Sequence, residues 1–97
     1  MAQFDVYRVA SGFVLDVQTD LLGDFPTRIV VPLLPNDLSP IPHKRLNPIL
    51  AVGDVDLRMG TQFASAMRAR DLGRPVTNLK DDYDQIKAAM DMLFNGF

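Results

Sequence analysis

The chain has 97 residues, of which 47% are hydrophobic and 23% are charged, with a formal net charge of −2 and no cysteine. This length suits one domain with a modest core. The acidic balance argues against broad, non-specific nucleic-acid binding, and without cysteine there are neither disulfides nor thiolate metal sites. We find no apolar run of the roughly 20 residues that a membrane span needs, and no signal-peptide pattern. We therefore expect a soluble cytoplasmic protein with a single domain over residues 1–97.

The N-terminal third predicts a hairpin followed by a buried strand. Apolar and polar residues alternate on both sides of Ser11-Gly12, so residues 3–18 are expected to form a β-hairpin whose strands each bury one face. A loop over 19–27 follows. Residues 28–34 are almost continuously apolar, which is typical of a strand covered on both faces, although Pro32 then requires an edge or a bulge.

The middle of the chain predicts an ordered loop and several short strands. Four prolines in residues 35–48 exclude a long helix or a central strand there, leaving room for one short helical turn. Residues 49–52 predict a second buried strand, and 56–59 a strand that returns after a turn. Weaker strand candidates lie at 62–67 and 75–77.

The C-terminal segment predicts the one clear helix, at about residues 80–94. Asn78 is expected to cap it, with Asp81 at the reciprocal position. Strands over about 3–78 and this helix give a mainly β (α+β) fold, a small curled sheet or barrel of five to seven strands crossed by a helix. One apolar stripe runs along the helix at a spacing of 4-3-4-3-4, formed by Leu79, Tyr83, Ile86, Met90, Leu93 and Phe97.

The end of the chain is unusually apolar for a terminus. Gly96 suits the left-handed position that ends a helix, which would aim Phe97 away from the helix axis. Phe97 then packs on its own core, lies between subunits, or is offered to a partner. If the stripe packs on the sheet and the tail pairs two subunits, the dimer interface contains Met90, Leu93, Phe94 and Phe97.

Few residues indicate catalysis or metal binding. His43 is the only histidine, and a solvated loop residue is a better interpretation of it than a general base. Asp16 and Asp20 could hold a cation, but hydrogen bonds to loop backbone are favoured. The sequence contains no phosphate loop and no nucleophile elbow. We therefore predict no catalytic residue, no metal and no cofactor.

A local basic strip is formed by Arg68, Arg70 and Arg74, with only Asp71 nearby. Such a strip could bind an acidic peptide or a phosphate backbone. Charge that protects an edge strand explains it equally well.

The sequence resembles the CcdB toxin family along nearly its whole length. The run Leu-Asp-Val-Gln-Thr-Asp-Leu-Leu at residues 15–22 resembles the signature segment of that family. Resemblance is weak only over 35–47 and 66–76. Further matches follow in family order at residues 4–7, 28–33, 48–54, 58–59, 61, 84–89, 94 and 96.

This resemblance implies an SH3-like barrel with a C-terminal helix that forms a homodimer. It also implies a toxin of a type II toxin–antitoxin module, which is not itself an enzyme. Such a toxin binds the dimerisation region of the DNA gyrase A subunit and traps the cleaved DNA–gyrase complex. A partly disordered CcdA-type antitoxin neutralises it, and together they repress their own promoter, with operator DNA contacted only through the antitoxin. The basic strip is the candidate antitoxin-binding surface, and no membrane is involved.

The gyrase-binding residues of the family correspond to Thr19, Leu21, Asp91, Asn95, Gly96 and Phe97. The family tail ends Trp-Gly-Ile, so Asn95 replaces a tryptophan that stacks on a gyrase arginine. An amide supplies neither that aromatic area nor the cation–π attraction, worth about 0.5–2 kcal/mol. Thr19 and Leu21 are mild changes from serine and isoleucine, whereas Asp91 adds a charge in place of asparagine.

Two alternatives remain open at this point. A CcdB-fold protein could have lost gyrase poisoning and kept only antitoxin binding. Less favoured is an endoribonuclease, because MazF-type toxins share this barrel. That activity would need His43 as a base and the basic strip as a phosphate site.

Overall fold

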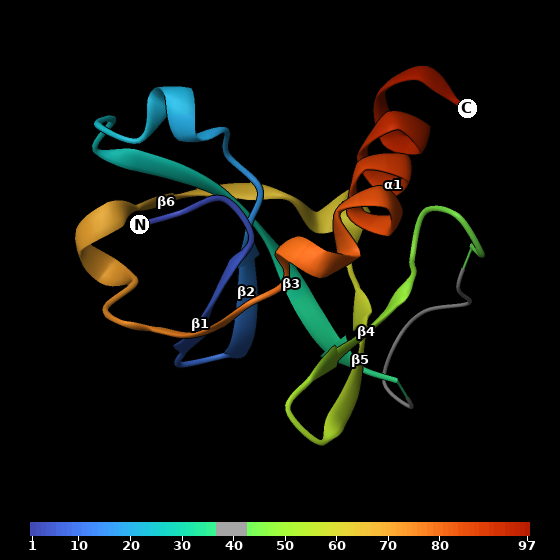
Figure 1. Cartoon of the computed structure of the whole chain (residues 1–97), viewed down its shortest axis with the longest axis horizontal. Helices are drawn as coiled ribbons and strands as arrows, with labels where there is room; N and C mark the ends of the chain where they lie inside the picture. Colours follow the sequence, from blue (N-terminus) through green and yellow to red (C-terminus); the bar gives the residue numbers. More distant parts are fainter. Residues whose placement is uncertain (37–42) are drawn as a thin grey trace.

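The computed structural model describes residues 1–36 and 43–97, and these form one curled sheet with a helix at its C-terminal end (Figure 1). The predicted mainly β, SH3-like architecture is confirmed. The sheet is antiparallel, in the order β4-β5-β3-β2-β1-β7, with β6 also paired to β3. The elements are β1 Asp5–Val9, β2 Gly12–Asp16, β3 Thr27–Pro35, β4 Ile49–Val52, β5 Val55–Met59, β6 Ser65–Arg68, β7 Pro75–Asn78 and α1 Tyr83–Asn95.

The long strand β3 organises the sheet. One side pairs with β2, while the other pairs first with β6 and then with β5. Between these two partners lies a 3₁₀ turn, Thr61–Phe63, and just before it Gly60 donates its N–H to the Pro32 carbonyl at 2.8 Å. The N and C=O of a strand residue point to the same side. The nitrogen of Pro32, which has no hydrogen to donate, therefore faces the gap between β5 and β6. No strand there needs a hydrogen bond from Pro32, so β3 accommodates the proline without being an edge strand and without a bulge.

Three local predictions need correction. β4 is not covered on both faces: Leu50 is buried, but Ile49 and Ala51 are exposed because β4 ends the sheet. The strand expected at 62–67 begins only at Ser65, after the 3₁₀ turn. The hairpin β1–β2 buries both faces at its centre rather than one.

The hairpin has two buried faces because a separate apolar cluster lies on each. Val6 and Leu15, which are register partners, join the larger cluster, which also contains Ile86 of α1. Their neighbours Tyr7 and Val14 join the second cluster instead. Consecutive apolar residues at the centre of each strand are therefore buried on opposite faces of the hairpin.

The segment before α1 differs from the simple capped helix that the sequence predicts. Residues Lys80–Asp82 form a 3₁₀ turn that follows Leu79, and α1 begins only at Tyr83, with Asp82 at its N-cap and no side-chain capping bond. Asn78 Oδ1 instead accepts the Lys80 N–H at 2.8 Å, at the start of the 3₁₀ turn. Phe4 holds this segment to the sheet. Its carbonyl accepts the Leu79 N–H at 2.9 Å, and its ring lies 5.7 Å from that of Tyr83. Phe4 does so at φ 72°, a conformation that bulky residues rarely adopt.

Only part of the loop expected at 35–48 can be compared, since residues 37–42 lie outside the described residues. At its end, Asn47 N–H donates to the His43 carbonyl at 2.8 Å, which closes one helical turn. The Asn47 amide donates to the Met59 carbonyl and to Gln62 Oε1 at 3.0 and 2.7 Å. A buried and fully engaged side chain thus anchors this turn to β5.

A buried ion pair joins β2 to β3, and nothing in the sequence pattern predicted it. Arg28 Nε donates to Asp16 Oδ2 at 2.7 Å, and both side chains are fully buried. Asp16 Oδ1 also accepts the Gln18 N–H at 3.0 Å, the backbone hydrogen bond that was expected of it. Both Nη groups of Arg28 lack a hydrogen-bond partner among the described residues. The pair therefore carries an uncompensated desolvation cost, and breaking it would raise that cost.

Tyr7 belongs to a second set of polar contacts, which joins β1 to the end of β7. Its hydroxyl donates to Asp5 Oδ2 at 3.3 Å, and Asp5 Oδ1 accepts from the Asn78 amide at 2.9 Å. Burial, together with the negative charges of Asp5 and Asp16, raises the pKa of Tyr7 to about 12. The neutral phenol is therefore the form that the folded protein favours.

Asp16→Ala should lower the free energy of unfolding by about 3–5 kcal/mol, because it leaves the Arg28 charge buried without a partner. Asp71→Ala, which breaks the exposed pair with Arg68, is the matched control and should cost about 0–1 kcal/mol. Urea denaturation measures both. Equal losses in the two variants would show that burial adds nothing to the Asp16–Arg28 pair.

Stability should also fall at high pH because of Tyr7. A phenol whose pKa is about 10 in the unfolded chain and about 12 in the fold stabilises the protein below pH 10, and this contribution disappears as pH rises from 10 to 12. The size of the loss is about 2–3 kcal/mol at about 1.36 kcal/mol per unit. Urea denaturation as a function of pH tests this against Tyr7→Phe, which should lack this part of the decline. An identical decline in Tyr7→Phe would assign it to other groups.

Candidate protein-binding surface

The last turn of α1 presents exposed aromatic side chains. Gly96 adopts the predicted left-handed conformation, φ 78°, and its N–H donates to the Met92 carbonyl at 3.0 Å. Phe94 is 70% exposed and Phe97 76% exposed. Of the three alternatives for Phe97, packing on its own core is therefore excluded in the single chain, and burial between subunits or in a partner remains.

The apolar stripe of α1 leaves the core about halfway along the helix. Ile86 is fully buried and Met90 is half-buried against the larger cluster, but Leu93 is 37% exposed. Figure 1 shows the reason, since the C-terminal end of α1 projects beyond the strands. A sequence stripe that is continuous in spacing is thus divided into a half that packs on the sheet and a half that faces outward. Tyr83, expected on the buried stripe, is also exposed.

A second apolar surface lies on the loop between β2 and β3, around the 3₁₀ turn Asp20–Leu22. Leu21 is 93% exposed, and Leu22 and Phe25 are also exposed. The loop is nonetheless well ordered by hydrogen bonds: Thr19 Oγ1 accepts the Leu21 N–H at 3.3 Å, and the Gln18 amide donates to the Leu22 carbonyl at 2.9 Å. The sequence analysis did not identify Leu22 and Phe25 as surface candidates, because the exposure of a loop residue follows no periodic pattern in the sequence.

The structure divides the six candidate gyrase-binding residues into two groups. Thr19 and Leu21 share the β2–β3 loop, whereas Asp91 and residues 95–97 share the end of α1. Both segments lie at the same side of the molecule in Figure 1, but well apart within one chain. Asp20, expected to bond loop backbone, does so by accepting the Gln3 N–H at 2.7 Å.

Asp91 already has a cationic partner on its own helix. Lys87 Nζ lies 2.8 Å from Asp91 Oδ2, one helical turn away, and this hydrogen bond raises the pKa of Lys87. The charge that distinguishes Asp91 from the family asparagine is therefore partly balanced within α1.

The basic strip is only partly assembled. Arg68, at the end of β6, is paired with Asp71 at 3.1 Å, and both side chains are largely exposed. Arg68 and Arg70 line a hollow of about 440 Å³ together with Pro26 and Ala69, whereas Arg74 is exposed but does not line it. Because β6 pairs only with β3 among the described strands, edge protection and ligand binding both remain consistent with Arg68.

His43 serves as a cap for a turn. Its Nδ1 accepts the N–H groups of Arg45 and Leu46, each at 3.3 Å. In the part of the chain that the structure describes, no carboxylate orients its ring, and no three potential ligands gather into a metal site. No described helix is both long enough and apolar enough to cross a bilayer.

Exposed apolar side chains on hydrogen-bonded backbone are typical of surfaces that bind other proteins. The family model described as CcdB protein matches residues 3–96, and the chain belongs to the CcdB family. Membership identifies it, at the level of the family, as a toxin of a toxin–antitoxin system. A search of curated proteins finds no significant match.

The two halves of the helix stripe should respond differently to a buried charge. Met90→Asp should lower the free energy of unfolding by about 2 kcal/mol or more, because Met90 packs on the larger cluster. Leu93→Asp should change it by less than about 1 kcal/mol in the monomer and should weaken self-association instead. Urea denaturation and sedimentation at several protein concentrations separate these effects. Equal destabilisation of the monomer would mean that the outer half of the stripe is also core.

Proposed function

We propose that this chain is the toxin of a type II toxin–antitoxin module, that it binds the DNA gyrase A subunit, and that it traps the cleaved DNA–gyrase complex without catalysing a reaction of its own. Family membership supports the class of protein. The exposed end of α1 is the single observation that carries the mechanism, because a poison of this kind needs an anchor side chain on a fixed backbone.

Phe97 is the anchor in this proposal. The Gly96 N–H bond to the Met92 carbonyl fixes where the chain leaves the helix, and Phe97 follows directly on this fixed point. Its ring supplies the aromatic area that Asn95 lacks. Thr19 and Leu21 add a second contact from the β2–β3 loop, which its own hydrogen bonds hold in place, and Asp91 adds a carboxylate at the rim.

A homodimer completes the binding surface in this proposal. Leu93 and Phe94 are exposed apolar groups on one rigid helix end, and pairing two such ends would remove them from water. Met90 would lie at the border between core and interface. Phe97 would lie at the rim of this contact, where it belongs to both the dimer and the gyrase-binding surface.

The proposed regulator is a CcdA-type antitoxin, a partly disordered protein that orders on the toxin surface. Arg68, Arg70 and Arg74 are the proposed contacts, with the hollow beside Arg68 and Arg70 as the place for an acidic segment. The complex would repress its own promoter, with operator DNA contacted through the antitoxin, and would act in the cytoplasm.

A gyrase cleavage assay with purified protein, ATP and supercoiled plasmid tests the mechanism. Linear DNA should accumulate after denaturant and protease treatment, and deletion of residues 95–97 should abolish it while circular dichroism shows an intact fold. Phe97→Ala should weaken poisoning strongly, since a buried anchor contributes about 2 kcal/mol or more. Val55→Ala is the matched control, because Val55 is an exposed apolar residue on the β4–β5 hairpin, away from the tail.

A folded, dimeric protein that gives no linear DNA would contradict the proposal. Asn95 is the observation behind the alternative, a CcdB-fold protein that keeps antitoxin binding alone. Asn95→Trp should then restore trapping of cleaved DNA. The endoribonuclease alternative would require RNA cleavage that His43→Ala removes, and the capping role of His43 does not favour it.

A further inference from the structure

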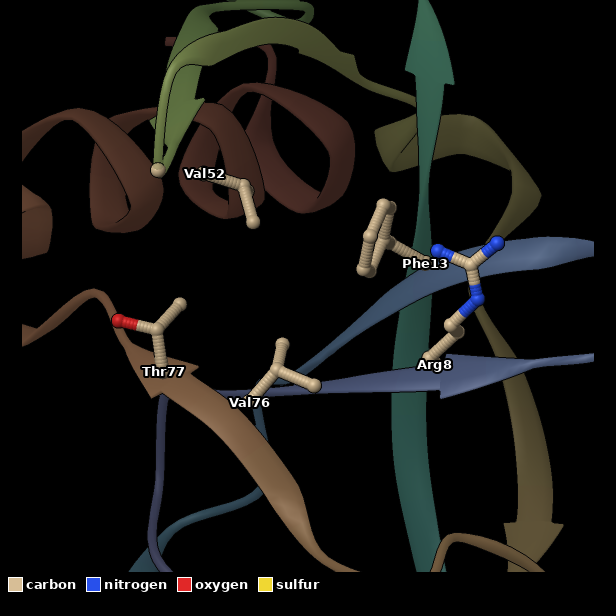
Figure 2. Close-up of a pocket in the computed structure, with 6 residues that line it drawn as sticks. Arg8, Phe13, Val52, Val76 and Thr77 are labelled. Carbon is tan, nitrogen blue, oxygen red and sulfur yellow. The ribbon is translucent and has the colours of Figure 1, made fainter.

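The half-barrel has an open seam between the two ends of its sheet. β4 and β7 stand at opposite ends of the strand order, and in the described part of the chain β4 pairs only with β5 and β7 only with β1. A groove of about 400 Å³ lies along this seam, lined by Arg8, Phe13, Val52, Gly53, Val76 and Thr77. Figure 2 shows Val52 facing Val76 and Thr77 across it, with Phe13 and Arg8 at one end.

The lining is mainly apolar, with the Thr77 hydroxyl and the Arg8 guanidinium as its polar groups (Figure 2). Val76 is 52% exposed, and Phe13 and Val52 are half-buried, so the groove offers apolar surface to solvent. The Arg8 guanidinium lies over the Phe13 ring, 5.3 Å from its centroid. Among the described residues Arg8 forms no ion pair, and none of the lining residues is acidic. The groove therefore presents an oriented and uncompensated positive charge.

Each of the end strands β4 and β7 also has one edge that pairs with no other strand in the described part of the chain. The outer edge of an end strand carries N–H and C=O groups that pair readily with another extended chain. Only an extended peptide matches this edge, because the backbone N–H and C=O groups of a helix are already paired with one another and cannot bond to a strand. A nucleic acid is disfavoured, since a single cation would meet its phosphates.

We propose that this groove binds an extended peptide segment of a partner protein, which adds as a strand to the free edge of β7. A carboxylate of the peptide pairs with Arg8, and its alternate apolar side chains lie on Phe13, Val52 and Val76. This surface contains none of the residues of the proposed gyrase, dimer or antitoxin contacts, so it goes beyond the proposed function.

Selection from a displayed library of random peptides about nine residues long, the length of a long strand, tests the proposal. Enriched peptides should alternate apolar residues around an Asp or Glu. Synthetic copies, titrated into ¹⁵N-labelled protein, should shift the amide signals of Val52, Gly53 and Val76. A copy that is N-methylated at alternate residues should not bind, because it keeps the side chains but cannot pair with β7.

Two variants make the test specific. Arg8→Gln should weaken the selected peptide about tenfold, which corresponds to about 1.4 kcal/mol, and Val76→Asp should do the same or more. Arg45→Gln is the matched control, since Arg45 is exposed on the turn at 43–47, and it should leave the affinity unchanged. Circular dichroism verifies that each variant folds. Arg8→Gln should still trap cleaved gyrase complexes as the wild type does, which separates this proposal from the proposed function.

The proposal is overturned if no peptide is enriched, if enriched peptides bind Arg8→Gln as well as wild type, or if their shifts map to the end of α1. Groove signals that shift with protein concentration alone would show that a second copy occupies the seam, which would also overturn it.

Discussion

The buried ion pair between Asp16 and Arg28 is the constraint on which the remaining structure depends. It joins the end of β2 to the start of β3, so it closes the loop that carries Leu21. If the two strand ends separated, each charge would remain buried without its partner at a large desolvation cost, so the pair holds the two ends together. The exposed turn is thereby fixed relative to the sheet, and the same β3 that carries Arg28 pairs with β2, β5 and β6. One electrostatic contact thus connects the core to a surface suited to binding.

Much of the fold follows from local sequence patterns. The β1–β2 hairpin, the strand expected over 28–34 and the helix ended by Gly96 were predicted correctly, because alternation, an apolar run and a left-handed glycine each report on neighbours in the chain. The extent of burial was predicted less well. Only one buried face was predicted for each strand of the hairpin, because the pattern cannot reveal that a second apolar cluster, which contains Tyr7, Val14 and Leu72, lies on the other face.

The candidate sites show the same limit more sharply. The family resemblance named Leu21 and Phe97, but only the structure shows that both are exposed, Leu21 on a hydrogen-bonded turn and Phe97 directly after the hydrogen-bonded Gly96. The residue spacing of the helix stripe is the same at Met90 and at Leu93. Met90 nonetheless packs on the core and Leu93 does not, because the C-terminal end of α1 projects beyond the strands (Figure 1). Arg8 and Val76 come together only through the pairing of β1 with β7, a long-range contact that no local pattern encodes.

The open seam also has a physical reason to stay open. Drawing β4 against β7 would complete the barrel and satisfy both edges, but it would bury the Arg8 guanidinium among Phe13, Val52 and Val76 without a carboxylate. The desolvation cost of an unpaired cation, several kcal/mol, exceeds what a few edge hydrogen bonds at about 1 kcal/mol each return. A strand that brings its own carboxylate removes that obstacle and keeps the edge pairing. None of the residues that line the groove belongs to α1 or to the tail after it, so such a strand leaves the Phe97 surface uncovered.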